Sequence, residues 1–374
     1  MELKQNISFA PFLIAGLIAG VLLSVLHYST NITSIFPSLW ASFYALFFLF
    51  AHSYERNKSI LLVSTLLASL LAALPLAWQF QSLENSINTP FSAILLSLVS
   101  AYALNTFNMH YQANQFKFQY ALLFYAVWDT FVHILVALFF ASVCWFLIFI
   151  TDLLFRFLNI SLIDQLISKA WFSITSTVLY LSIGLWIAAT ANQVIRSIRM
   201  ILLLICRYLM IPLSLIGIVF FMGLVFKGMQ TTTEVPYSLS VLMSFLSIVF
   251  INGIYQAGQT PQPTSALYIG ICRAYLYITP FFPLLVLLFM VGKPLNVSHF
   301  QFLISSLILL AYNIAYAVIA FRSKLFLSNA MEKINIVFVF ILIFITVCAF
   351  NAGVLELFPK SNTVYKSPPS TSIS

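Results

Sequence analysis

The chain has 374 residues, of which 62% are hydrophobic and only 7% are charged. Soluble globular proteins hold about 25% charged residues, so this composition excludes a water-soluble domain of this size. The net charge of +8 does not indicate nucleic-acid binding, because the basic residues lie on short loops beside apolar segments and form no soluble basic module. We expect an all-α, multi-pass transmembrane helical bundle.

Four membrane spans are predicted in the first part of the chain. The first, 9–26, carries Gly16 and Gly20 in a GxxxG pattern, which favours close helix packing. It is expected to be an uncleaved span, because no small-residue cleavage site of a secretory signal follows it. The next three spans are predicted at 35–51, 59–80 and 90–107.

The stretch 118–157 contains no proline or glycine and predicts one long helix. As a helix, the segment from Asp129 to Asp152 would be about 34 Å long, close to the thickness of the hydrocarbon core of a bilayer. We therefore expect a single crossing over 131–151, with the two aspartates at opposite membrane faces. Two crossings in this stretch would give twelve spans, but the turn residues they require are missing.

The second part of the chain predicts a short interfacial segment and six more spans, which makes about eleven in total (10–12). The interfacial segment is 160–169, and the spans are 170–191, a run after Arg207 that ends near 226, 237–254, 271–291, 300–321 and 334–355. Pro280 and Pro283 are expected to kink the ninth span. The polar segment 255–264 predicts a linker between an N-terminal eight-span region, 1–254, and a C-terminal three-span region, 265–358. The tail, 359–374, is expected to be disordered.

The basic residues also predict an orientation. With eleven spans, eleven Lys and Arg fall on the side of the amino terminus and six on the other side. The positive-inside rule then places the amino terminus in the cytoplasm and the tail outside. Residues 188–374 hold eleven basic and three acidic side chains, which favours contact with anionic lipid head groups.

Two pairs of ionisable residues lie four positions apart on the long helix. Asp129 and His133 share one face, so they could relay protons near a membrane face, or they could form an interfacial pair that anchors the helix. Asp152 and Arg156 predict a salt bridge at the other helix end.

Four arginines are candidate contacts for anionic head groups. Arg196, Arg199 and Arg207 fall within an 80° arc if their helix is continuous, and guanidinium groups match phosphate oxygens; the alternative is a topology anchor. Arg273 lies inside the ninth span, where it could line a substrate path or reach back to the interface.

Signatures of known enzyme classes are absent from the sequence. It contains no phosphate loop, no GxSxG and no HExxH, and the four cysteines are scattered without the spacing of a zinc site. We therefore expect no catalytic residues, no metal and no cofactor.

Two parts of the sequence resemble a known family. Residues 145–160 (WFLIFITDLLFRFLNI), and residues 271–318, with ICRAYLYITPFFPLLVLL, a Gly-Lys-Pro turn and LNVSHFQFLISSLILLAYNIAYAV, look like a bacterial family of polytopic inner-membrane proteins catalogued only as a domain of unknown function. The likeness covers about residues 10–355, although His299 stands where an arginine is expected. The resemblance implies a bacterial inner membrane and assigns no site.

The functional expectation is a transporter-like or permease-like protein for a small or amphiphilic solute. The alternatives are a non-catalytic membrane scaffold or regulatory partner and, third, an embedded lipid-modifying enzyme. A polar cavity near Asp129, His133 or Arg273 would favour the first, a solid apolar interior the second, and a lipid-sized groove over the arginine arc the third.

Overall fold

The computed structural model describes residues 7–27, 32–52, 58–84, 91–114, 119–158, 160–227, 237–258, 265–291, 297–322 and 328–349. These residues form helices and contain no β-strand, which confirms the all-α prediction. The elements in chain order are α1 (Ala10–His27), α2 (Ile32–His52), α3 (Lys58–Glu84), α4 (Phe91–Asn114), α5 (Tyr120–Phe157), α6 (Leu162–Ile167), α7 (Ala170–Thr190), α8 (Asn192–Lys227), α9 (Tyr237–Tyr255), the 3-10 turn η2 (Gln256–Gly258), α10 (Ala266–Ile278), α11 (Phe281–Met290), α12 (Val297–Arg322) and α13 (Ala330–Ala349).

Eight helical segments of the described chain are long and apolar enough to cross a membrane: α3, α5, α7, α8, α9, α10 together with α11, α12 and α13. Shorter apolar runs lie in α1 and α2, at 10–25 and 36–51. Each of the eleven predicted spans coincides with a helix of the described chain. α4 is one of these helices, but it is too polar to count among the eight candidate membrane spans. These helices make the chain an integral, multi-pass membrane protein.

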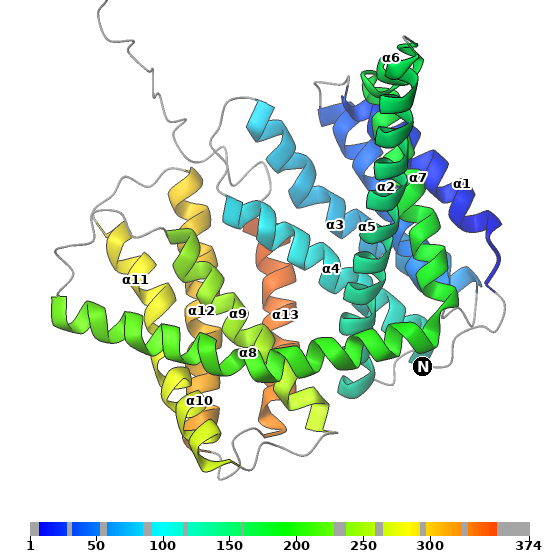
Figure 1. Ribbon diagram of the computed structural model, residues 1–374. Coiled ribbons are helices and arrows are strands. Elements are labelled where there is room, and N and C mark those ends of the chain that lie inside the picture. The colour runs from blue at the N-terminus through cyan, green and yellow to red at the C-terminus, as the bar shows by residue number, and fades with distance from the viewer. Residues whose placement is uncertain are drawn as a thin grey trace, which may run out of the picture.

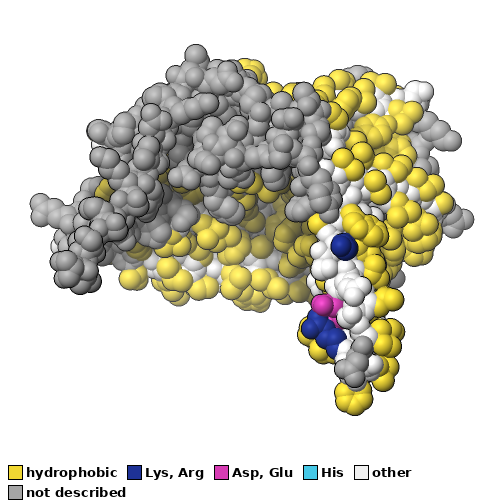
Figure 2. All heavy atoms as spheres, turned by 90° about the horizontal axis from the view of Figure 1, so that it is seen from above, with side chains coloured by type: hydrophobic (Ala, Val, Ile, Leu, Met, Phe, Trp, Pro, Cys, Tyr) yellow, Lys and Arg dark blue, Asp and Glu magenta, His cyan; other side chains and the backbone are white. Residues whose placement is uncertain are grey.

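The outward faces of the helices are strongly apolar, as lipid contact requires. On α5, Phe139 is 73% exposed and Phe157 is 87% exposed, and the view from above shows hydrophobic side chains over much of the described surface (Figure 2). Contiguous apolar surface of this extent is untenable in water but favourable against hydrocarbon.

The predicted long helix is confirmed, because α5 runs without a break from Tyr120 to Phe157. It forms an upright hairpin with α7, with the short α6 at its tip (Figure 1). The Trp145 indole donates to Thr177 Oγ1 across the hairpin at 3.0 Å. The predicted salt bridge is also present: Arg156 Nε lies 2.8 Å from Asp152 Oδ2, and the same guanidinium contacts Asp164 on α6. These ion pairs fix the turn at the end of the hairpin.

The helices pack in two groups, and α8 runs across both (Figure 1). The first group joins α1, α2, α3, α5 and α7, and the second joins the later half of α8 with α9 to α13. α4 packs against α3 and α5 of the first group and against α12 and α13 of the second.

The core of the second group includes residues on both sides of the predicted linker 255–264. Ile251 and Ile254 on α9 share one buried cluster with Cys272 and Tyr275 on α10. Residues 259–264 lie outside the described part of the chain. The later half of α8 and α12 also contribute to this cluster. The division into an eight-span and a three-span region stays a prediction.

Glycines allow the closest helix contacts of the first group. A Cβ atom on Gly16 would lie 2.6 Å from Ser182 Cβ, and one on Gly20 would lie 2.9 Å from Thr175 Cα. The GxxxG pattern thus packs α1 directly onto α7, as the sequence predicts.

Prolines divide the predicted ninth span. α10 ends at Ile278 and α11 begins at Phe281, with Thr279 and Pro280 between them. Proline lacks the N–H that a continuous helix requires, so the kink predicted from Pro280 and Pro283 is confirmed at this position.

Candidate functional site

An ion pair joins α5 and α8 where the two helices cross. Arg199 Nη1 donates to Asp129 Oδ1 at 2.7 Å, and the two side chains are only 14% and 17% exposed. The Arg199 guanidinium also lies over the ring of Tyr125, at 4.4 Å from its centroid. The aromatic face and the carboxylate together neutralise a cation that is largely removed from solvent.

His133 lies one turn further along α5 and contacts the main chain. Its Nδ1 is 2.6 Å from the carbonyl oxygen of Asp129, and the side chain is buried against the ring of Phe50. The Asp129 carboxylate contacts Arg199, whereas the imidazole contacts the Asp129 carbonyl. The structure therefore brings Asp129, His133 and Arg199 together, but through two different groups of the aspartate.

The remaining arginine candidates lie elsewhere on α8 and α10. α8 is continuous through Arg196, Arg199 and Arg207, as the arc requires. Arg196 is exposed, whereas Arg207 is half-buried and its carbonyl oxygen accepts a hydrogen bond from Tyr268 on α10 at 2.8 Å. Arg273 is half-buried on α10. Arg199 is engaged by the Asp129 carboxylate, so Arg196 and Arg207 on the same helix are better placed than Arg199 to meet a head group.

A polar cluster in the second helix group was not predicted from the sequence. Five hydroxyl and amide side chains converge there from α5, α9, α12 and α13. We call this set the Tyr–Asn cluster; its members are Tyr120, Asn252, Tyr312, Tyr316 and Asn335.

Asn335 is the centre of the Tyr–Asn cluster. Its Nδ2 donates to Tyr120 Oη and to Asn252 Oδ1, both at 2.6 Å, while its Oδ1 accepts from the hydroxyls of Tyr312 and Tyr316. Asn252 Nδ2 donates in turn to Tyr316 Oη at 2.8 Å. Tyr316 and Asn335 are buried. One carboxamide therefore ties four polar side chains from three other helices.

Further polar pairs flank the cluster: on α9, Tyr255 lies about one turn after Asn252 and Ser244 about two turns before it. The Tyr255 hydroxyl donates to Glu332 Oε1 at 2.8 Å, and Asn313 Nδ2 donates to Ser244 Oγ at 2.6 Å. From Ser244 to Tyr255 these groups follow α9 over about 16 Å, roughly half the thickness of a hydrocarbon core. The polar groups thus form a line through the second group that ends at a carboxylate.

The turn after Tyr255 is strained. Gln256 and Ala257 have φ angles of 46° and 52°, in the left-handed region that side chains with a Cβ atom rarely adopt. Gly258 continues this conformation with φ 69°. This turn ends α9 directly after Tyr255, whose hydroxyl donates to Glu332. The strained backbone is therefore adjacent in sequence to the residue that contacts the carboxylate.

One signal in the sequence points to this line of polar groups. Asn252, Asn313 and Asn335 each stand within a predicted span, and an amide in hydrocarbon requires a hydrogen-bond partner. The pattern reveals that partners must exist but not which helices supply them.

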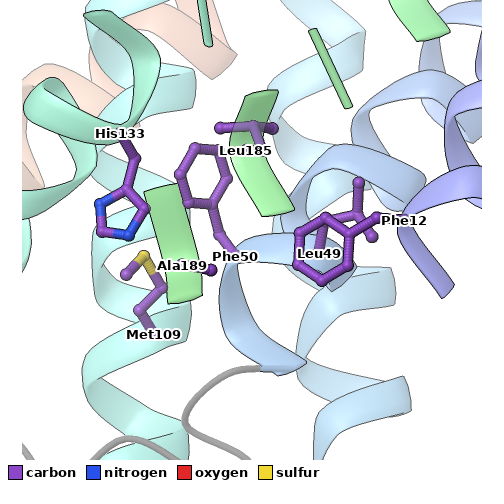
Figure 3. A pocket seen from close by; sticks show the side chains of 7 residues that line it. All are labelled: Phe12, Leu49, Phe50, Met109, His133, Leu185 and Ala189. Atoms are coloured by element: carbon purple, nitrogen blue, oxygen red, sulfur yellow. The ribbon is translucent and has the colours of Figure 1, made fainter. Parts of the chain in front are cut away.

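The first helix group contains an apolar crevice between α1, α2 and α7, with a volume of about 270 Å³. A smaller cavity of about 10 Å³ adjoins it, and both are lined by Leu49 and Leu185. In Figure 3 His133 and Met109 lie at one end of the small cavity and Phe12 and Leu49 at the other. The space beside His133 is thus small and lined mainly by hydrocarbon.

The described residues contain no group of three or more His, Cys, Asp or Glu side chains arranged to hold a metal ion. The four cysteines are free thiols.

Comparison of the chain with protein-family models, with curated proteins and with solved structures finds no match. The arrangement of the polar and ionisable side chains is therefore the basis for the functional proposal.

Proposed function

We propose that the protein is a permease-like carrier of a small or amphiphilic solute, and that the Tyr–Asn cluster forms its polar contact surface. The observation that supports the proposal is the convergence of five hydroxyl and amide groups from four helices inside the second helix group. Polar side chains are costly in hydrocarbon, and within membrane proteins they concentrate along solute and ion paths.

The chemistry of the cluster suits a neutral or zwitterionic solute. Hydroxyl and carboxamide groups both donate and accept hydrogen bonds. Hydrogen bonds within the cluster can therefore be replaced by hydrogen bonds to a solute. Glu332 at the end of the polar line supplies one acidic group that would attract a cationic or amine-bearing solute. The strained turn at Gln256 and Ala257 lies beside that group and is a hinge candidate. Its residues have positive φ angles, so the backbone releases strain when it rotates to another conformation.

The second candidate is a scaffold, and one observation favours it. Asn335 satisfies its side-chain donors and acceptor within the cluster, as expected of hydrogen bonds that only hold membrane helices together. Such bonds contribute about 0.6 to 2 kcal/mol each in membrane proteins, which is enough to fix helix positions.

Uptake into proteoliposomes separates the two candidates. A panel of labelled neutral, zwitterionic and amine-bearing solutes is tested with the intact protein and with Tyr316→Phe, which removes one cluster hydroxyl. Tyr277→Phe is the matched control, because its hydroxyl lies outside the cluster on a half-exposed side chain. If the protein is a carrier, Tyr316→Phe should lose uptake and Tyr277→Phe should not, while both variants keep their melting temperature. Absence of uptake in the intact protein, with a lower melting temperature of Tyr316→Phe, supports the scaffold.

The location and partners are proposals of the same kind. The resemblance of residues 145–160 and 271–318 to a bacterial inner-membrane family supports the cell inner membrane, and the distribution of Lys and Arg supports a cytoplasmic amino terminus. Anionic lipids are the proposed partners of Arg196 and Arg207, whereas Arg199 is engaged by Asp129. The proton relay of Asp129 and His133 stays a prediction.

A further inference from the structure

The crevice between α1, α2 and α7 is lined almost entirely by hydrocarbon. Its two hydroxyl-bearing lining residues are satisfied within the protein: Ser182 Oγ donates to the carbonyl of Phe12 at 2.5 Å, and Ser42 Oγ donates to the carbonyl of Ser38 at 2.7 Å. A polar occupant would therefore lose its hydrogen bonds to water and gain none.

Small side chains create the space. Ala15, Gly16 and Ala19 on α1 and Ala45 on α2 line the crevice. Gly16 and Gly20 hold α1 against α7, with hypothetical Cβ atoms 2.6 Å and 2.9 Å from their nearest neighbours. Because α1 is already in contact with α7, it cannot move further to close the gap. The small side chains and the contact of α1 with α7 therefore keep the crevice open.

The size of the crevice restricts its occupant. An apolar cavity of about 150 Å³ is known to bind benzene, and this crevice measures about 270 Å³. A space of this size with a hydrocarbon lining fits a slender hydrocarbon chain.

We propose that the crevice between α1, α2 and α7 binds one hydrocarbon chain of a membrane lipid. The walls belong to apolar helices, so the surrounding bilayer supplies this ligand. The site lies in the first helix group, away from the Tyr–Asn cluster, and its occupation does not depend on carrier activity.

The test uses the intact protein in vesicles of phosphatidylglycerol and phosphatidylethanolamine that contain a phospholipid with a photoreactive diazirine in one acyl chain. After illumination, labelled peptides are quantified by mass spectrometry. We expect the lining residues of α1, α2 and α7 to be labelled more than the lipid-facing residues of α12. Ala45→Leu fills the crevice and should reduce labelling of α1 and α7 about tenfold, as expected when contact with roughly two methylene groups is lost.

Two further variants complete the design. Ala15→Leu fills the crevice from the other wall, so it replaces Ala45→Leu if that variant does not fold. Ala311→Leu adds the same side chain on the exposed face of α12 and should leave labelling of the crevice unchanged.

Three results would overturn the proposal. The first is equal labelling of the crevice and of the α12 surface, which indicates only the lipid that surrounds any membrane protein. The second is labelling that neither filling variant reduces. The third is disulfide formation between two copies of Ala45→Cys, which places a second chain at the crevice. None of these measurements depends on uptake of a solute.

Discussion

Arg199 on α8 and Asp129 on α5 form a partly buried salt bridge, with 2.7 Å between Nη1 and Oδ1. The two residues are 70 positions apart in the chain. Each charge is more than four-fifths removed from solvent, so each depends on the other for compensation.

Removal of one partner should therefore destabilise the protein strongly. Arg199→Gln leaves the Asp129 carboxylate without its cation and should cost about 3 kcal/mol of the free energy of unfolding, whereas Asp129→Asn/Arg199→Gln should recover most of that loss. Denaturation in detergent measures both. Arg196→Gln, on the exposed face of the same helix, is the control. Similar losses in Arg196→Gln and Arg199→Gln would show that the ion pair is unimportant.

The predicted proton relay can be tested through the same aspartate. If uptake is linked to protons, Asp129→Asn should abolish its pH dependence, because no carboxylate remains to exchange a proton. It is made together with Arg199→Gln, so that no unpaired buried cation remains. His133→Gln should shift the pH profile, since the imidazole meets the main chain of Asp129 at 2.6 Å. The pH dependence of uptake in proteoliposomes is the measurement. Lower membrane abundance of both variants, with recovery when His133→Gln is added to Asp129→Asn/Arg199→Gln, would make the pair a structural anchor.

The contact of α1 with α7 should be intolerant of any added side chain. Gly20→Ala places a Cβ atom 2.9 Å from Thr175 Cα and should lower the free energy of unfolding by about 1 to 3 kcal/mol. Gly223→Ala is the matched control, because a Cβ atom there meets nothing within 4 Å, so it should be neutral or stabilising. Thermal unfolding in detergent compares the two. Equal melting temperatures would contradict the close packing.

The orientation of the chain is testable with reporter fusions. A fusion after Glu84, at the end of α3, should report the periplasmic side, because the following predicted loop carries no positive charge. A fusion after Lys360, which lies outside the described residues, should report the same side. A cytoplasmic signal at Lys360 would mean an even number of spans and would refute a single crossing of α5.

Arg196 and Arg207 on α8 should retain anionic lipid. Arg196→Gln/Arg207→Gln should weaken retention of phosphatidylglycerol or cardiolipin in native mass spectrometry, since a guanidinium group binds phosphate through paired hydrogen bonds. Arg199 is left intact to preserve the salt bridge with Asp129. Gln193→Ala is the control on the same helix. Unchanged lipid retention would reduce these arginines to topology anchors.

The sequence alone determined the class of the protein and much of its helical organisation. Apolar composition requires lipid as solvent, and lipid requires every backbone N–H and C=O to bond within the chain, so helices follow. Local chemistry also determined the unbroken α5, the kink at Pro280, the ion pair of Asp152 with Arg156 and the packing face of Gly16. Each of these depends on residues within a few helical turns.

Only the tertiary structure decided the partners of the polar groups. Helical spacing placed His133 beside Asp129, but Arg199, 70 positions away, binds the carboxylate. The Tyr–Asn cluster joins Tyr120 to Asn335 over 215 positions. A polar side chain in an apolar helix signals that it needs a partner; which helix supplies that partner depends on how helices pack across the bundle, and no local pattern encodes that packing.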